Sequence, residues 1–244
     1  MLDKNSPKPL YAQLEEILRT SILGGRWQPN TAIPSELELS RTYGVSRMTA
    51  RAVVTQLVND GLLRRVQGKG TFILEQKIPT KSLAYMGIRE QLERLGYQTT
   101  TKLLSFRQIE CSQNLAEKLG IMQGDSVHFI ERLRSIDGSS ISLHRSYIPA
   151  ALAPGLKDDM LENEQLCVIL QNEFNLKAAI VNETLESVLA SPEEAQLFMV
   201  NKTFPLLILD DIYKTSSGRP FEFTRVLFRG DKIKLSFDYS TKNA

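Results

Sequence analysis

The sequence predicts an α+β protein of two domains, and three observations support this. In the first third, short amphipathic helices with clear capping residues precede a glycine-rich hairpin. The remainder is dominated by strand-like runs that hairpin turns at Asp137-Gly138 and Ser217-Gly218 connect. Between these regions, the polar segment 75–82 contains Pro79 and has no periodicity. We therefore expect one domain over 1–74, a linker over 75–82, and a second domain over 83–244 with an antiparallel sheet and helices.

The helices of the first domain are indicated by their N-terminal residues. Pro9 suits the first turn of a helix whose apolar stripe extends over 14–22. Ser35 and Glu38 have the spacing of a capping box. Ser46 caps a further helix, in which residues at intervals of three and four share one apolar face: Ala50, Val53, Val54, Leu57 and Val58.

The opposite face of this helix suits DNA. It carries Arg47, Met48, Arg51 and Thr55, which are mostly cationic or hydroxyl-bearing side chains. Two short apolar runs then flank Gln67-Gly68-Lys69-Gly70, whose glycines allow a sharp turn. Exposed arginines on a lone helix are more often simply solvated, but this order of helices and hairpin is typical of a winged helix-turn-helix. The sequence therefore favours contacts with phosphates and base edges.

Three motifs of the first domain resemble those of the GntR family of bacterial transcription regulators: P-S-E at 34–36, V-S-R-x-T-x-R at 45–51 and G-L-L-x-R-x-Q-G-x-G-T-F at 61–72. The resemblance implies a set of DNA-binding residues: Ser35, Arg41, Ser46, Arg47, Met48, Thr49, Arg51, Gln67, Gly68, Lys69 and Gly70. One position departs from the family pattern, because Leu37 stands where many members have arginine. Arg41 and Arg26 are the candidate replacements.

Charge and composition narrow the class of protein. Residues 1–81 hold 12 Lys and Arg against 7 Asp and Glu, a net charge of +5, whereas the remainder has 18 against 21, or −3. A basic first domain beside a mildly acidic second one fits a polyanion partner for the first alone. No long apolar run or signal peptide is present, so we expect a cytoplasmic protein without a membrane partner. Cys111 and Cys167 lack metal-ligand spacing and are expected to be buried free thiols.

The second domain is expected to contain a helix over 88–95, and strands over 101–110, 126–136, 140–148, 178–190, 205–215 and 220–228. Further helices are expected after Ser112, over 164–173, and after Ser191. Several motifs resemble those of the HutC-like subgroup of the GntR family, notably I-E-R-L-R at 130–134, Y-I-P at 147–149 and F-R-G-D at 228–231. In this subgroup the second domain, called UTRA, has a chorismate-lyase-like fold and binds a small effector that alters the fit of paired DNA-binding domains to the operator.

Arg132 and Arg134 are two residues apart on a predicted strand, so both project from one face and together can hold a phosphate or carboxylate. They predict a small anionic effector, such as a sugar phosphate or carboxylate. The alternative is that they form surface ion pairs with Glu131 or Glu222. With the resemblance, the candidate effector-binding residues are Met86, Gly87, Ile88, Arg89, Arg132, Arg134, His144, Gln165 and Glu222.

Three departures from the family pattern surround this expected pocket. His144 replaces an acid, Tyr85-Met86-Gly87-Ile88-Arg89 replaces a loop that usually offers a small hydroxyl and an aromatic, and Ile233 replaces an aromatic. Either the effector differs from the amino-sugar phosphate of better-known relatives, or the pocket has partly decayed. Arg89 and His144 would add positive charge for a more highly charged anion.

The leading hypothesis is a homodimeric transcription regulator, specifically a repressor, that binds a pseudo-palindromic double-stranded DNA operator and responds to an effector. A constitutive DNA-binding dimer, whose second domain only dimerises or recruits a protein, is the alternative. An enzyme is disfavoured, because no nucleophile–base pair or phosphate-binding glycine loop is evident. With two histidines in the chain, neither a metal nor another cofactor is expected.

Overall fold

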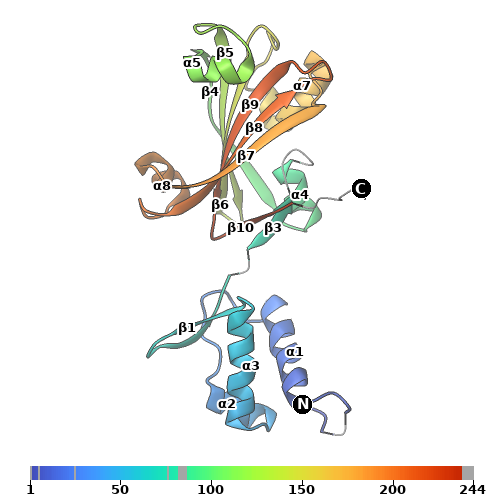
Figure 1. Ribbon diagram of the computed structural model, residues 1–244, viewed down its shortest axis with the longest axis vertical. Helices are drawn as coiled ribbons and strands as arrows, with labels where there is room; N and C mark the ends of the chain where they lie inside the picture. Colours follow the sequence, from blue (N-terminus) through green and yellow to red (C-terminus); the bar gives the residue numbers. More distant parts are fainter. Residues whose placement is uncertain (1, 5, 25, 76, 82–86, 238–244) are drawn as a thin grey trace, which may run out of the picture. The chain divides into compact units, whose positions relative to one another are not determined.

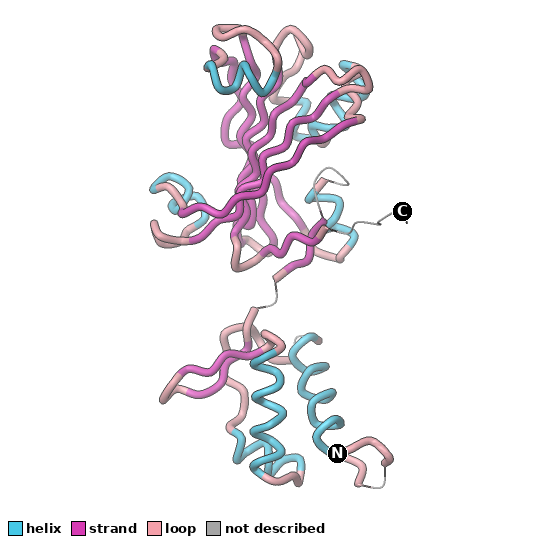
Figure 2. Tube along the Cα trace, viewed as in Figure 1, coloured by secondary structure: helices cyan, strands magenta, loops and turns pink. Residues whose placement is uncertain are grey.

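The computed structural model describes residues 2–4, 6–24, 26–75, 77–81 and 87–237. The chain forms two compact units, Met1–Lys77 and Ile78–Ala244 (Figures 1 and 2). Among the described residues, no helix is both long and apolar enough to span a membrane.

The first unit is a winged helix-turn-helix, as the sequence predicts. It consists of α1 (Leu10–Leu23), α2 (Glu36–Tyr43), α3 (Arg47–Asn59) and the antiparallel hairpin of β1 (Leu63–Val66) with β2 (Gly70–Ile73). Its core is formed by buried side chains from all of these elements, including Leu14, Leu18, Leu39, Val53, Leu57, Leu63 and Ile73. The unit therefore has a complete hydrophobic core of its own.

The predicted caps are present. The Ser35 side chain accepts from the backbone N–H of Glu38 at 3.3 Å, and the Glu38 carboxylate accepts from the backbone N–H of Ser35 at 2.7 Å. Gly44 ends α2 in the left-handed region at φ 67°, a conformation that favours glycine. Ser46 accepts from the backbone N–H of Thr49 at 3.0 Å and begins α3. These caps fix the short turn between α2 and α3.

The second unit is built on an antiparallel six-stranded sheet of order β4-β5-β6-β9-β8-β7. Its strands are β4 (Thr99–Glu110), β5 (Ser126–Ile136), β6 (Ser139–Pro149), β7 (Ile180–Leu189), β8 (Pro205–Lys214) and β9 (Pro220–Arg229). Its helices are α4 (Ile88–Arg94), α5 (Gln113–Leu119), α6 (Met160–Asn163), α7 (Leu166–Phe174) and α8 (Pro192–Phe198).

Alternation along the strands divides the sheet into two faces. On one face, Leu143 and Leu227 pack against α8, and Val127 and Phe223 pack against α5. On the other face, the helices are α4 and α7, which pack on separate groups of buried residues. Since α4 and α7 cover different parts of this face, polar side chains of β5, β6 and β9 between them line a cavity.

The expected linker over 75–82 is wrong for residues 78–81. These residues form β3 (Ile78–Lys81), which pairs in parallel with β10 (Ile233–Ser236), so a small parallel sheet accompanies the antiparallel one. Four residues that include Pro79 give no local strand signal, and the pairing partner lies far along the chain. Gln91 of α4 also holds this strand, because its side chain accepts from the backbone N–H of Lys81 at 2.6 Å and donates to the Lys81 carbonyl at 3.1 Å.

Candidate DNA-binding face and effector cavity

The exposed face of α3 presents the residues that the sequence assigns to DNA. Arg47, Met48 and Arg51 are exposed, and Met48 is 71% exposed although it is apolar. Neither Arg47 nor Arg51 makes an ion pair with another described residue. Their guanidinium groups are therefore available for phosphates and bases.

The hairpin turn lies near the start of α2. Gly68 and Gly70 have φ values of 73° and 116°, which only glycine adopts readily. A groove of about 400 Å³ brings together four of the predicted residues, Ser35, Arg47, Lys69 and Gly70. Leu37, which is 43% exposed, also lines this groove, so the arginine position of the family is filled here by an apolar side chain. Of the other predicted residues, Arg41, Ser46, Gln67 and Gly68 are exposed and Thr49 is half-buried.

Arg65 is a residue of this face that the sequence analysis missed. From β1 it donates to the Thr55 hydroxyl of α3 at 2.9 Å and pairs with the Glu36 carboxylate of α2 at 3.2 Å. It thus ties the hairpin to both helices. Its position in the G-L-L-x-R motif was the available signal.

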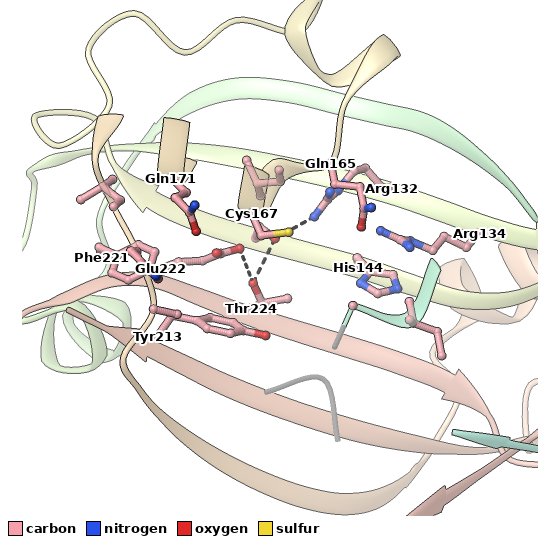
Figure 3. Close-up of a pocket in the computed structure, with 17 residues that line it drawn as sticks. Arg132, Arg134, His144, Gln165, Cys167, Gln171, Tyr213, Phe221, Glu222 and Thr224 are labelled. Carbon is pink, nitrogen blue, oxygen red and sulfur yellow. Dashed lines mark hydrogen bonds between the residues drawn. The ribbon is translucent and has the colours of Figure 1, made fainter. Parts of the chain in front are cut away.

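The register of the large sheet places the effector candidates on one face. Arg132 of β5 is opposite His144 of β6, which is opposite Val226 of β9, and Arg134 is opposite Ser142. A cavity of about 280 Å³ opens above them (Figure 3). Of the predicted residues, Gly87, Ile88, Arg132, Arg134, His144, Gln165 and Glu222 line it. The cavity also has polar or aromatic lining residues that the sequence did not indicate: Ser146, Gln171, Lys177, Tyr213, Phe221 and Thr224.

The two remaining predicted residues are Met86 and Arg89. Met86 falls outside the described residues, together with Tyr85. Arg89 pairs with Glu93 at 2.7 Å and lines an adjoining cavity of about 490 Å³ that also contacts Arg132 and Arg134. Ile233, expected near the pocket, is instead buried beside Ile78 and Phe228 in the core below α4.

A chain of hydrogen bonds crosses the floor of the first cavity. Arg132 donates to the Ser146 hydroxyl at 3.1 Å, the hydroxyls of Ser146 and Thr224 share a hydrogen bond of 3.0 Å, and Thr224 donates to Glu222 at 2.7 Å. Burial raises the pKa of Glu222 and lowers that of Arg132, although each charge favours ionisation of the other. The cavity therefore has a cationic end and an acidic end that are linked by hydroxyls.

Arg134 has no such partner. Its side chain is buried, with 7% exposure, and its Nε and Nη1 atoms have no hydrogen-bond partner among the described residues. Burial, followed by repulsion from Arg132 and then Arg89, lowers the pKa of Arg134 to about 9, so it remains a cation at neutral pH. A buried and unpaired charge is costly, and an anion bound in the cavity would compensate it.

The alternative of surface ion pairs for Arg132 and Arg134 is wrong. Glu131 projects to the opposite face, where Arg145 binds it at 2.8 Å. Glu222 accepts from Thr224 and makes no ion pair with either arginine among the described contacts. Both arginines are buried rather than exposed.

His144 does not add positive charge, contrary to expectation. It is buried, and its Nε2 atom lies 3.0 Å from the Ser142 hydroxyl. Burial, then repulsion from Arg134 and Arg132, lowers its pKa well below the usual value, so the imidazole is neutral. Cys167 also differs from expectation, because it is exposed and lines the cavity, whereas Cys111 is buried as predicted.

Comparison with known proteins places these two units in one family. The family model described as bacterial regulatory proteins, gntR family, matches residues 10–73, and the UTRA domain model matches residues 94–234. The chain is 30% identical to the HTH-type transcriptional repressor NagR of Bacillus subtilis over 95% of each chain. It is 29% identical to the histidine utilization repressor of Pseudomonas putida, over 96% of this chain and 93% of that protein.

The fold also matches a solved structure. The crystal structure of PhnF from Mycobacterium smegmatis superposes with a TM-score of 0.72 at 21% identity, covering 94% of this chain and all of the other. The two family models and the relatives confirm the resemblance of the first unit to the GntR family and of the second unit to its HutC-like subgroup. The chain belongs to the GntR family of transcription regulators, in its HutC-like subgroup, with an N-terminal helix-turn-helix and a UTRA effector domain.

Proposed function

We propose that the protein is a cytoplasmic repressor whose UTRA domain binds a small anionic metabolite and thereby changes its affinity for an operator. The observation that carries the effector class is the buried guanidinium of Arg134, which has unpartnered donors and lies beside Arg132 in the cavity. Relatives named as repressors support repression rather than activation of transcription. In this proposal, the cavity that Arg132 and Arg134 line binds the metabolite and does not catalyse a reaction on it.

On the DNA side, we propose a homodimer that reads a pseudo-palindromic site with two copies of α3. Dimer symmetry doubles the contacts of one short helix, because two half-sites about one helical turn apart are read at once. The remaining proposed contacts come from the hairpin, through Gln67 to Gly70, and from Ser35 and Arg41.

Replacing Arg51 with alanine is expected to abolish operator preference and to leave effector binding intact. Loss of a bidentate contact between arginine and guanine costs about 1–3 kcal/mol and relaxes one base position. An operator selected from random DNA by the unchanged protein would be titrated with both proteins at one salt concentration. Arg94→Ala, which removes an exposed charge from α4, is the control and should change neither property. Equal losses of operator and effector binding in Arg51→Ala would contradict the assignment of DNA binding to the first unit and effector binding to the second.

The effector class is tested by thermal unfolding in the presence of inorganic phosphate, sugar phosphates and carboxylates. A ligand at a hundred times its dissociation constant stabilises the folded state by about 2.7 kcal/mol. We expect a stabilising anion whose effect disappears in Arg132→Ala. If no anion raises the unfolding temperature and no metabolite alters DNA binding, a constitutive DNA-binding dimer would be favoured.

A further inference from the structure

The second cavity adjoins the first across the arginine pair. It measures about 490 Å³, and both cavities are lined by Arg132, Arg134 and Gln165. Its other wall comes from β4, where Thr101 is directly opposite Arg134 and Leu103 is opposite Arg132. The two cavities thus share the arginine pair as a common boundary.

Positive charge gathers around the second cavity. Arg89 of α4 joins Arg132 and Arg134 in its wall, so three arginine side chains line one space. Glu164 also lines it, but the carboxylate of Glu164 accepts a hydrogen bond of 2.7 Å from the backbone N–H of Gln165. Arg89 is held by Glu93 in a partly exposed ion pair within one helix, a kind of pair that contributes little and is readily exchanged. The balance of charge favours an anion here as well.

Arg134 has the donors for two acidic groups. A guanidinium group presents five N–H donors along two edges, one formed by Nε with a terminal nitrogen and the other formed by the two terminal nitrogens. The unpartnered buried atoms of Arg134 are Nε and Nη1, so each edge has a donor without a partner among the described residues. One phosphate or carboxylate on one edge would leave a donor unused on the other.

We propose that the second cavity is a subsite for a second acidic group, so that the effector is a metabolite with two separate acidic groups that bind on either side of Arg134. A phosphorylated carboxylic acid and a bisphosphate are the chemical classes that fit. The proposal rests on the proposed function of the first cavity as an anion site. Arg89 and the Thr101 hydroxyl would then select for the second group.

The test compares two probes that differ in one group. Glycerol 3-phosphate and 3-phosphoglycerate have the same length, and only the second carries a carboxylate besides its phosphate. Calorimetric titration of the full chain is expected to give about tenfold tighter binding of 3-phosphoglycerate, as a charge-assisted hydrogen bond to arginine provides. In Arg89→Gln this preference should fall to less than about threefold, where the preference is the ratio of the two affinities measured on the same variant.

The same helix supplies the matched control. Arg94→Gln removes a guanidinium that also pairs with a glutamate four residues away, at 2.7 Å, but does not line the cavity, so the preference should persist. Thr101→Val, a change of nearly equal volume on β4, should weaken binding of 3-phosphoglycerate alone and checks the subsite from its other wall.

The outcomes separate this proposal from the one on which it rests. If glycerol 3-phosphate binds, but 3-phosphoglycerate gains nothing or keeps its gain in Arg89→Gln, the second subsite is overturned and the anion site in the first cavity stands. If neither probe binds at millimolar concentration, the subsite is overturned as well. If Arg132→Ala also leaves every anion response unchanged, the proposed effector function fails with it.

Discussion

Replacing Arg134 with methionine is expected to stabilise the second unit and to abolish its binding of anions. The guanidinium is buried without a partner among the described residues, so the protein without its ligand bears the full cost of desolvation. Methionine fills a similar volume with a flexible apolar chain, and even the replacement of buried ion pairs by apolar residues is often neutral or stabilising by about 1–4 kcal/mol. Differential scanning calorimetry without ligand, followed by titration with phosphate, measures both effects.

Arg145→Met is the matched control on the neighbouring strand. Arg145 projects to the other face, where it binds Glu131 and Glu194 at 2.8 Å each, so its removal leaves two carboxylates without their cation. Breaking such a largely buried pair costs about 3 kcal/mol or more, and stability should fall. A loss of stability in Arg134→Met comparable to that in Arg145→Met would show that Arg134 is a structural residue and not a ligand-binding one.

Replacing Asp211 with asparagine is expected to remove a large part of the pH dependence of stability. Asp211 of β8 is fully buried, its Oδ1 atom has no hydrogen-bond partner among the described residues, and Tyr213 donates to its Oδ2 atom at 3.2 Å. Burial, then repulsion from Glu183, raises the pKa of Asp211 from 3.8 to about 8. The folded protein therefore keeps a proton that the unfolded chain releases.

The direction of the pH dependence of stability follows from this retained proton. The stabilisation is fully present below about pH 4, falls as the pH rises through the interval up to about pH 8, and is lost above it, with a total of several kcal/mol. Asparagine has no proton to release, so the difference in free energy of unfolding between variant and original should grow in favour of the variant from pH 5 to pH 8. Calorimetry at each pH measures it.

Asp210→Asn provides the contrast at the adjacent position. Burial opposes ionisation of Asp210, but the hydrogen bonds and positive charges of Arg225 and Lys118 together outweigh burial and lower the pKa of Asp210. Its contribution is present above pH 3.8 and is lost as the pH falls through the lowered pKa, so the replacement should destabilise equally at pH 5 and pH 8. Parallel pH profiles for Asp211→Asn and the original protein would refute the raised pKa.

The sequence predicts those features whose causes are local. The caps at Ser35 and Ser46 follow from side chains that bond within three residues, and the hairpin at Asp137-Gly138 follows from two residues with positive φ. The shared face of Arg132 and Arg134 follows from strand alternation alone. Each of these could be inferred without knowledge of the rest of the fold.

Features that depend on distant parts of the chain could not be predicted in this way. Arg65 acquires its partners from two other elements, and Asp211 becomes a buried acid only because β7 and β9 lie on either side of β8. The neutral state of His144 depends on burial and on two arginines from the neighbouring strand, which its own segment does not reveal. Sequence reasoning therefore placed the two arginines on one face but misjudged the charge of His144.

The pairing of β3 with β10 sets the order in which the two units can fold during translation. All of the buried core of the first unit comes from residues up to Ile73, so the DNA-reading part is complete early in translation. The strand that follows it must wait for residues 233–236 before its ladder can form. A nascent chain can therefore fold its DNA-binding unit before β3, the first strand of the second unit, has a strand to pair with.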